Sequence, residues 1–300
     1  MTSHAEYRWA SAELRDGRLV FDSADGLARA LSDGFFFVKM PFGCDLAAGD
    51  RFAQNFYLPE GTGEYDPYRD FRSWTADRLS DHEGYFLRDV DQVEQFFLES
   101  RFWQQVFPPA LAQQARDMQS FATDILAAVL TELDIPRPIW DKATGGSLSG
   151  RGTYHLTFNH FRHHVRARGL NTHKDSGWVT VLRSLEPGLE VRRGADWLPI
   201  TPRPDAFIVN FGCAIEILMR DTSTPVAAVA HRVTEQCDVD RSAPDRFSYA
   251  LFVDSSLDAE ICEGLYRYHP ARGLTLEADF KQFLDDILKN TYELDSEGLY

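Results

Sequence analysis

Residues 150–256 constrain the fold most, because short β-type runs alternate there with turn-forming residues. Each run is rich in β-branched and aromatic residues and is shorter than an ordinary helix. The runs cover residues 154–161, 178–182, 189–192, 207–211, 227–233 and 246–253. Many short strands at this spacing are typical of a sandwich or jelly roll, so we expect a mainly β core.

The N-terminal half has a different pattern, which is mixed and mainly helical. Apolar residues recur at three- and four-residue steps over residues 109–134, which predicts a helix with one buried face. Residues 19–21 and 35–38 predict short strands, and the turn signal Asp33-Gly34 precedes the second. Residues 59–86 are polar, aromatic and weakly periodic, so they predict a long loop, either functional or an ordered surface excursion.

The C-terminal part predicts a second amphipathic helix over residues 275–292, with Phe280, Phe283, Leu284, Ile287 and Leu288 on one side. The tail of residues 293–300 is expected to be loose or to fold over the site. Neither a repeat nor a linker divides the chain, so we expect a single domain. It would consist of a helical N-terminal region with short strands (1–149), a β core (150–256) and a C-terminal helix with its tail (257–300).

The net charge is −15, from 46 acidic and 31 basic residues, so the surface repels nucleic-acid phosphates. The cysteines are widely spaced and are expected to be free thiols of a reducing compartment: Cys44, Cys213, Cys237 and Cys262. Neither a signal-peptide core nor an apolar run long enough to span a bilayer is present. We therefore expect a soluble cytoplasmic protein without membrane or nucleic-acid partners, either a monomer or a weak homo-oligomer.

A candidate metal site begins with His173 and Asp175, which point to the same face if the backbone is extended. His231 offers a third ligand. Two imidazoles and one carboxylate can occupy one face of an octahedral Fe(II) ion, which leaves positions for a bidentate 2-oxo acid and for O2. An HxD pair also occurs often by chance, and the alternative is a surface turn plus an unrelated buried histidine.

Arg246 and Ser248 share a face by the same alternation and suggest an anion site. A buried guanidinium needs an anionic partner, and the distal carboxylate of 2-oxoglutarate would fit its fork of donors. The alternative is an arginine at a strand edge that pairs with Asp245 or Asp254.

The ordered set of motifs resembles the 2-oxoglutarate/Fe(II) dioxygenases of the isopenicillin N synthase-like superfamily. No single motif is specific, but their order and spacing together are. Residues 33–36 resemble the family's DGFF strand, and residues 156–161 resemble its Asn-Tyr-Tyr-Pro-type strand. Residues 173–182 resemble its HTDxGxLTLL stretch. Residues 188–204 resemble its GLQV…W…VPPxP run, and residues 210–216 resemble its NxGDxLE motif.

This resemblance implies a double-stranded β-helix with flanking helices. It implies Fe(II) on His173, Asp175 and His231, and 2-oxoglutarate on Arg246 and Ser248 with Asn159 nearby. Such an enzyme uses O2 to hydroxylate, desaturate or cyclise a small molecule, here expected in secondary metabolism, and releases succinate and CO2. Phe161 stands where the family has a phenol and Cys213 where it has an aspartate.

Substrate-binding candidates are Arg162 and His164, in a locally basic run, and Tyr85 and Phe86 in the preceding loop. The basic run would attract a substrate carboxylate or phosphate; the alternative is a solvated hairpin. Among aromatic strand residues we expect core rather than cavity positions. Rival functions are an oxidase of the same fold that works without 2-oxoglutarate, a Zn(II) hydrolase with the same ligands, and a non-catalytic jelly-roll binding protein.

Overall fold

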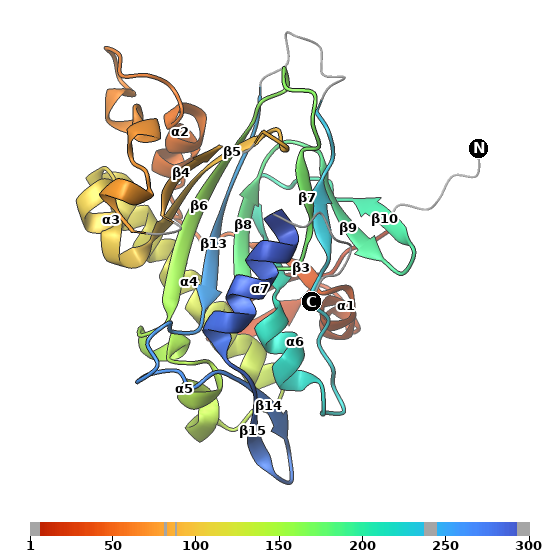
Figure 1. Cartoon of the computed structure of the whole chain (residues 1–300). Helices are drawn as coiled ribbons and strands as arrows, with labels where there is room; N and C mark the ends of the chain where they lie inside the picture. Colours follow the sequence, from red (N-terminus) through yellow and green to blue (C-terminus); the bar gives the residue numbers. More distant parts are fainter. Residues whose placement is uncertain (1–6, 81–82, 88, 237–244, 293–300) are drawn as a thin grey trace.

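The computed structural model describes residues 7–80, 83–87, 89–236 and 245–292 (Figure 1). Two sheets face each other, as the strand pattern predicts. The large sheet runs in the order β2 (Arg18–Phe21), β1 (Ser11–Arg15), β3 (Phe35–Lys39), β11 (Ala206–Phe211), β8 (Val179–Ser184), β13 (Arg246–Asp254), β6 (Thr153–Phe161), β5 (Val93–Glu99), β4 (Gly84–Leu87). The small sheet runs β10 (Asp196–Pro199), β9 (Leu189–Arg193), β12 (His231–Val233), β7 (Leu170–His173).

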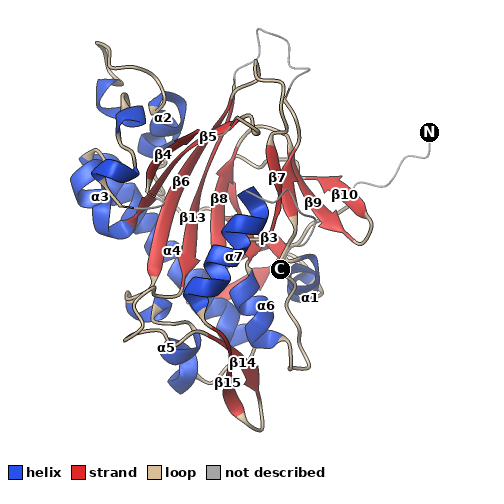
Figure 2. Ribbon diagram, viewed as in Figure 1, coloured by secondary structure: helices blue, strands red, loops and turns tan. Residues whose placement is uncertain are grey.

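Helices cover the large sheet from outside (Figure 2). The predicted long helix is confirmed as α4 (Pro109–Glu132), which contacts β2, β8 and β13. Beside it lie α2 (Ala47–Asn55), α3 (Ser100–Val106) and α5 (Trp140–Ala143), whereas α1 (Gly26–Asp33), α6 (Cys213–Met219) and α7 (Phe280–Tyr292) lie toward the small sheet. Within the described residues, no helix has the length and apolar character needed to cross a membrane.

Alternating strand residues supply two separate cores. On β3, Phe36 and Val38 pack toward the helices, whereas Phe35 and Phe37 pack into the space between the sheets. Ile208 on β11 joins the inner core in the same way. This continuous apolar run on β3 therefore reflects a strand that is covered on both faces.

Several boundaries differ from the sequence prediction. The C-terminal helix begins at Phe280 and not at residue 275, because residues 273–278 form β15 (Gly273–Ala278), which pairs with β14 (Leu265–His269). Residues 227–230 precede β12 and are not part of a strand. The N-terminal half is also less helical than expected, since it contributes β1 to β5 to the large sheet.

The long polar stretch before β4 contains three short 3-10 helices, η1 (Asp66–Tyr68), η2 (Phe71–Ser73) and η3 (Ala76–Arg78). It is thus an ordered excursion over most of its length. Cys44, Cys213 and Cys262 are free thiols, as predicted. Cys237 and the tail proposed as a lid (293–300) lie outside the described residues.

Candidate metal and cosubstrate site

The structure brings His173, Asp175 and His231 together between the two sheets. His173 ends β7, and His231 opens the antiparallel strand β12 directly opposite it. One ligand atom from each of the three residues lies within 4.8 Å of the others. The carboxylate oxygen Oδ1 of Asp175 is 3.8 Å from Nε2 of His173 and 3.7 Å from Nε2 of His231. These separations are too long for hydrogen bonds and leave room for an ion between the three side chains.

Neighbouring groups orient the three side chains. The Nδ1 atoms of His173 and His231 donate to backbone carbonyls of Asn171 (2.8 Å) and Val229 (3.1 Å), so each Nε2 keeps its lone pair for a metal. Nδ2 of Asn210 donates to the other oxygen of Asp175 at 3.3 Å. Burial, followed by the neighbouring imidazole, lowers the pKa of His173 to about 4, which favours the neutral, ligating form. This donor set fits Fe(II).

The antiparallel pair β6–β13 builds the rest of the site as a ladder of inward-facing residues. Phe161 lies opposite Arg246, and Asn159 lies opposite Ser248. Further along the same faces, the pairs are Thr157 with Ala250, His155 with Phe252 and Thr153 with Asp254. Every second residue of each strand therefore lines the interior.

A cavity of about 70 Å³ joins the metal-ligand candidates to Arg246, Ser248 and Asn159. The Arg246 side chain is 4% exposed and donates from Nε to the Pro187 carbonyl (2.9 Å) and from Nη2 to Ser184 (3.2 Å). Its Nη1 atom is buried and has no hydrogen-bond partner among the described residues. Burial lowers the pKa of this guanidinium to about 10.

Neither carboxylate proposed as an alternative partner reaches Arg246. Asp245 accepts hydrogen bonds from His160 and His163, and Asp254 accepts one from Ser176. Arg246 thus lines the cavity with its Nη1 atom unpaired among the described residues, and an acidic ligand would fit there.

Two departures from the family pattern have local explanations. The ring of Phe161 lies 4.5 Å below the Arg246 guanidinium, so a cation–π contact stands where a phenol would donate a hydrogen bond. Cys213 is buried, burial raises its thiol pKa, and its backbone N–H donates to the Asp175 carbonyl at 2.8 Å. That contact does not depend on the side chain.

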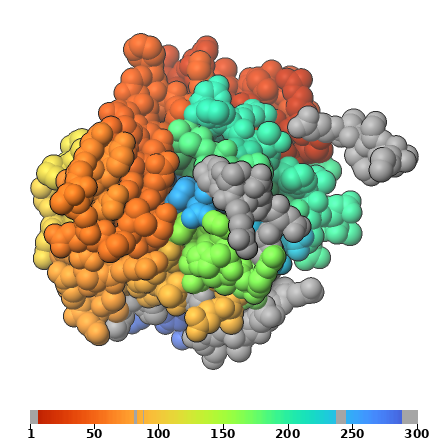
Figure 3. Space-filling view, turned by 90° about the horizontal axis from the view of Figure 1, so that it is seen from above, coloured from red at the N-terminus to blue at the C-terminus, as the bar shows by residue number. Residues whose placement is uncertain are grey.

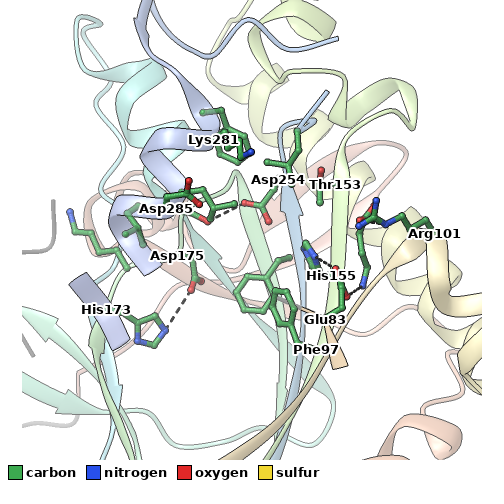
Figure 4. A pocket seen from close by; sticks show the side chains of 18 residues that line it. Glu83, Phe97, Arg101, Thr153, His155, His173, Asp175, Asp254, Lys281 and Asp285 are labelled. Atoms are coloured by element: carbon green, nitrogen blue, oxygen red, sulfur yellow. Dashed lines mark hydrogen bonds and ion pairs between the residues drawn. The ribbon is translucent and has the colours of Figure 1, made fainter. Parts of the chain in front are cut away.

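A larger cavity of about 310 Å³ opens beside His173 and Asp175 (Figure 4). Its walls come from β5, β6, β13 and α7, and Phe252 lines both this cavity and the smaller one. Lys174 borders the cavity and forms an ion pair with Glu216 at 3.1 Å, which is the salt bridge expected for a residue between two ligands.

The four predicted substrate residues line neither cavity. Arg162 donates to the backbone carbonyls of Gln92 and Asp91, and His164 is exposed. Tyr85 and Phe86 lie on the edge strand β4, where the Tyr85 hydroxyl donates to Glu94. Seen from above, the green segment after β6 lies on the surface beside orange segments of the N-terminal half (Figure 3).

Sequence reasoning missed several lining residues. Gln95 donates to Oδ1 of Asn159 at 2.7 Å, and the Asn159 amide lies 3.4 Å from Ser248. Thr157, His155 and Asp254 also face the interior. Strict alternation along residues 153–161 and 246–254 would have identified those on β6 and β13; Gln95 carries no such signal, because β5 was not recognised as a strand.

The family model for the 2OG-Fe(II) oxygenase superfamily matches residues 153–255, from β6 to the end of the core. Over these residues the chain is similar to the 2OG-Fe(II) oxygenase superfamily. The matched range contains every residue predicted for the metal and the cosubstrate. Members of the superfamily use Fe(II), 2-oxoglutarate and O2.

Curated relatives are plant oxygenases. Codeine O-demethylase of Papaver somniferum is 40% identical over 95 residues, which is 31% of this chain and 24% of the relative. Jasmonate-induced oxygenase 2 of Arabidopsis thaliana is 30% identical over 164 residues, which is 52% of this chain and 41% of the relative. The chain therefore spans less than half the length of these two relatives.

Solved structures of similar fold extend over more of the chain. The crystal structure of JOX2 in complex with 2OG, Fe and JA has a TM-score of 0.63 at 23% identity and covers 87% of this chain and 80% of that chain. The crystal structure of the dioxygenase for auxin oxidation in rice has a TM-score of 0.63 at 21% identity. It covers 94% of this chain and 96% of that chain. At these identities the likeness establishes the double-stranded β-helix fold.

Proposed function

We propose that this protein is a 2OG-Fe(II) oxygenase, which oxidises a small organic molecule with O2 while 2-oxoglutarate is converted to succinate and CO2. For a hydroxylation, one oxygen atom enters the substrate and the other enters succinate. The observation that supports this most directly concerns Arg246. Its buried Nη1 lacks a hydrogen-bond partner in the described part of the chain, and the residue lines the same cavity as the metal-ligand candidates. A dicarboxylate that chelates the metal at one end would reach this arginine with the other.

His173, Asp175 and His231 would hold Fe(II) on one face and leave the opposite face open. When bound, the iron and 2-oxoglutarate supply the oxidant. Arg246 would bind the distal carboxylate through Nη1, and Ser248 would add a hydroxyl. Gln95 fixes the Asn159 amide, whose Nδ2 is directed toward Ser248 at the same end of the cavity.

The charge around Arg246 supports a dianionic cosubstrate. Glu186 lies nearby and favours the charged guanidinium, but its carboxylate accepts a hydrogen bond from the Phe247 amide and makes no ion pair with Arg246 among the described residues. A desolvated cation without a contacting anion is costly. The cosubstrate carboxylate would offset that cost.

The larger cavity would receive the substrate next to the iron, with water excluded by its apolar walls. The names of the relatives, an O-demethylase of codeine and a jasmonate-induced oxygenase, support hydroxylation or a related oxidation in secondary metabolism. We also propose that residues 1–300 form one domain, since β3 lies between β1 and β11 in a single sheet.

Succinate formation tests this function. The full chain with Fe(II), O2 and 2-oxoglutarate should release succinate slowly even without substrate, and His231→Ala should abolish the release. Cys44→Ser, at an exposed position outside both cavities, should leave the rate unchanged. Consumption of O2 without succinate would favour the oxidase that works without 2-oxoglutarate, and zinc-dependent hydrolysis without O2 consumption would favour the hydrolase.

A further inference from the structure

We propose that an acidic wall of the larger cavity binds a basic nitrogen, so that the substrate is a small apolar amine. This acidic wall consists of Glu83, His155 and Asp254. Figure 4 shows Glu83 and His155 across the cavity from His173 and Asp175, with Asp254 between the two groups. The inference rests on the proposed function, because it places the substrate beside the iron.

Asp254 is the first element of the argument. Its side chain is 6% exposed, and its only side-chain hydrogen bond within the described residues comes from Ser176 at 3.2 Å. No lysine or arginine in the described ranges forms an ion pair with it, and it lines the cavity. A buried carboxylate without a cation is unfavourable unless a ligand supplies the charge.

Glu83 and His155 form the second element. Glu83 is 2% exposed; it is 3.1 Å from Nε2 of His155 and accepts the Glu99 amide at 2.8 Å. Nε2 of His155 donates to this carboxylate, and the residue lines the cavity beside Glu83. The imidazole also stacks on Phe97, with ring centroids 4.3 Å apart.

The positive side chains of the cavity are poorly placed for an anionic substrate. Arg101 contacts Glu99 at 2.8 Å, and Lys174 contacts Glu216. Lys281 also lines the cavity and lies near Asp254 in Figure 4, but it is exposed and forms no ion pair within the described residues. Asp254 is a buried carboxylate of the cavity without an ion pair in the described chain, which favours a cationic ligand over a carboxylate.

A second metal ion is a poorer explanation. Ligand atoms of Glu83, Glu99 and His155 also lie within 4.8 Å of one another. However, Glu83 and His155 are 3.1 Å apart and already hydrogen-bonded, whereas the corresponding distances at the first cluster are 3.7–3.8 Å. Arg101 moreover neutralises Glu99.

The remaining walls of the cavity are apolar and would fit an apolar substrate skeleton. Phe97 and Phe252, whose ring centroids lie 6.5 Å apart, flank the acidic wall and offer aromatic faces to a cation. Phe280, Leu284 and Ile287 of α7 cover the other side. An apolar skeleton with one ammonium group would match both surfaces.

The test compares three probes of similar shape: phenethylamine, phenethyl alcohol and hydrocinnamate. Each is titrated calorimetrically into the anaerobic full chain loaded with Fe(II) and 2-oxoglutarate. The amine should bind at least about tenfold more tightly than the other two, a difference of about 1.4 kcal/mol. Asp254→Asn and Glu83→Gln, which keep the size of the side chains, should each reduce this preference about tenfold.

Glu60→Gln is the matched control, because it removes an exposed carboxylate that lines neither cavity, and it should keep the preference. Tighter binding of hydrocinnamate, equal binding of the probes, absence of any binding at millimolar concentration, or an amine preference that survives both substitutions would overturn the inference. The visible band of the Fe(II)–2-oxoglutarate complex, recorded on the same samples, separates this failure from failure of the proposed function.

Discussion

At the scale of single residues, Arg246 is notable as a buried guanidinium with one nitrogen atom that has no partner in the described chain. Two of its nitrogen atoms donate hydrogen bonds to the protein, and the third, Nη1, is buried without a partner in the described chain. We predict that Arg246→Gln weakens 2-oxoglutarate binding by about 10- to 100-fold, the loss expected for a charge-assisted hydrogen bond, and leaves Fe(II) binding intact. Calorimetric titration of the iron-loaded protein measures both.

Arg192→Gln serves as the control, since Arg192 is exposed on β9 and lines neither cavity. An unchanged dissociation constant for 2-oxoglutarate in Arg246→Gln would remove the cosubstrate from this position.

Asn210 offers a second prediction at this scale. Its amide donates to the Asp175 oxygen that is not shared with the histidines. Asn210→Ala should lower Fe(II) affinity by about 10- to 100-fold, as is usual when a group that orients a ligand is removed. Iron content after dialysis against a graded chelator series measures this, and full retention of iron would show that Asp175 is oriented without Asn210.

The sequence predicted that His173, Asp175 and His231 would lie together, as they do, although Asp175 lies just beyond the end of β7 and not on the strand itself. It did not predict the substrate wall. Arg162 and Tyr85 looked suitable by composition, yet both lie outside the cavities, because nearness in sequence to the HxD motif does not determine which face of a strand is inside.

At the scale of elements, the antiparallel pair β6–β13 supplies residues that line both cavities. Its register places Arg246 at one end of the ladder and Asp254 at the other, so the residues proposed for the cosubstrate and for the substrate lie along one interior face. The local sequence predicted both strands, but their mutual register depends on pairing between segments far apart in the chain.

Gly34, which lies between α1 and β3, permits a prediction about stability. It ends α1 with φ of 79°, and a Cβ atom there would lie 2.8 Å from the Val229 nitrogen. Gly17, in the β1–β2 turn, has φ of 73° but open space around it. Gly34→Ala should therefore lower the free energy of unfolding by at least about 1 kcal/mol more than Gly17→Ala, since only the first adds a steric clash to the backbone strain.

Urea denaturation of the two variants measures this difference. Equal losses in both would mean that the chain relaxes around residue 34 without cost.

At the scale of the whole molecule, the long-range arrangement of the N-terminal half was the least predictable part. The strand β5 was missed although it pairs with β6 along its full length, because its sequence, VEQFFLE, lacks regular alternation. The helix α4 was predicted well, since its apolar stripe is a local property.

The apolar face of α4 packs against the large sheet. Ile125 of α4 is fully buried in the outer core, so Ile125→Ala should lower the free energy of unfolding by about 2–5 kcal/mol through lost burial and a cavity. Ser120→Ala, on the exposed side of the same helix, should change it by less than about 0.5 kcal/mol. Similar values for both variants in chemical denaturation would contradict the packing described for α4.

The central claim is that one cavity holds both the iron and 2-oxoglutarate. Anaerobic titration of the metal-free full chain with Fe(II) and then 2-oxoglutarate tests it most directly, through the visible metal-to-ligand charge-transfer band. We predict that the band appears in the unsubstituted protein, is lost in His231→Ala and requires far more 2-oxoglutarate in Arg246→Gln. Binding of Fe(II) without any such band at saturating 2-oxoglutarate would contradict the claim.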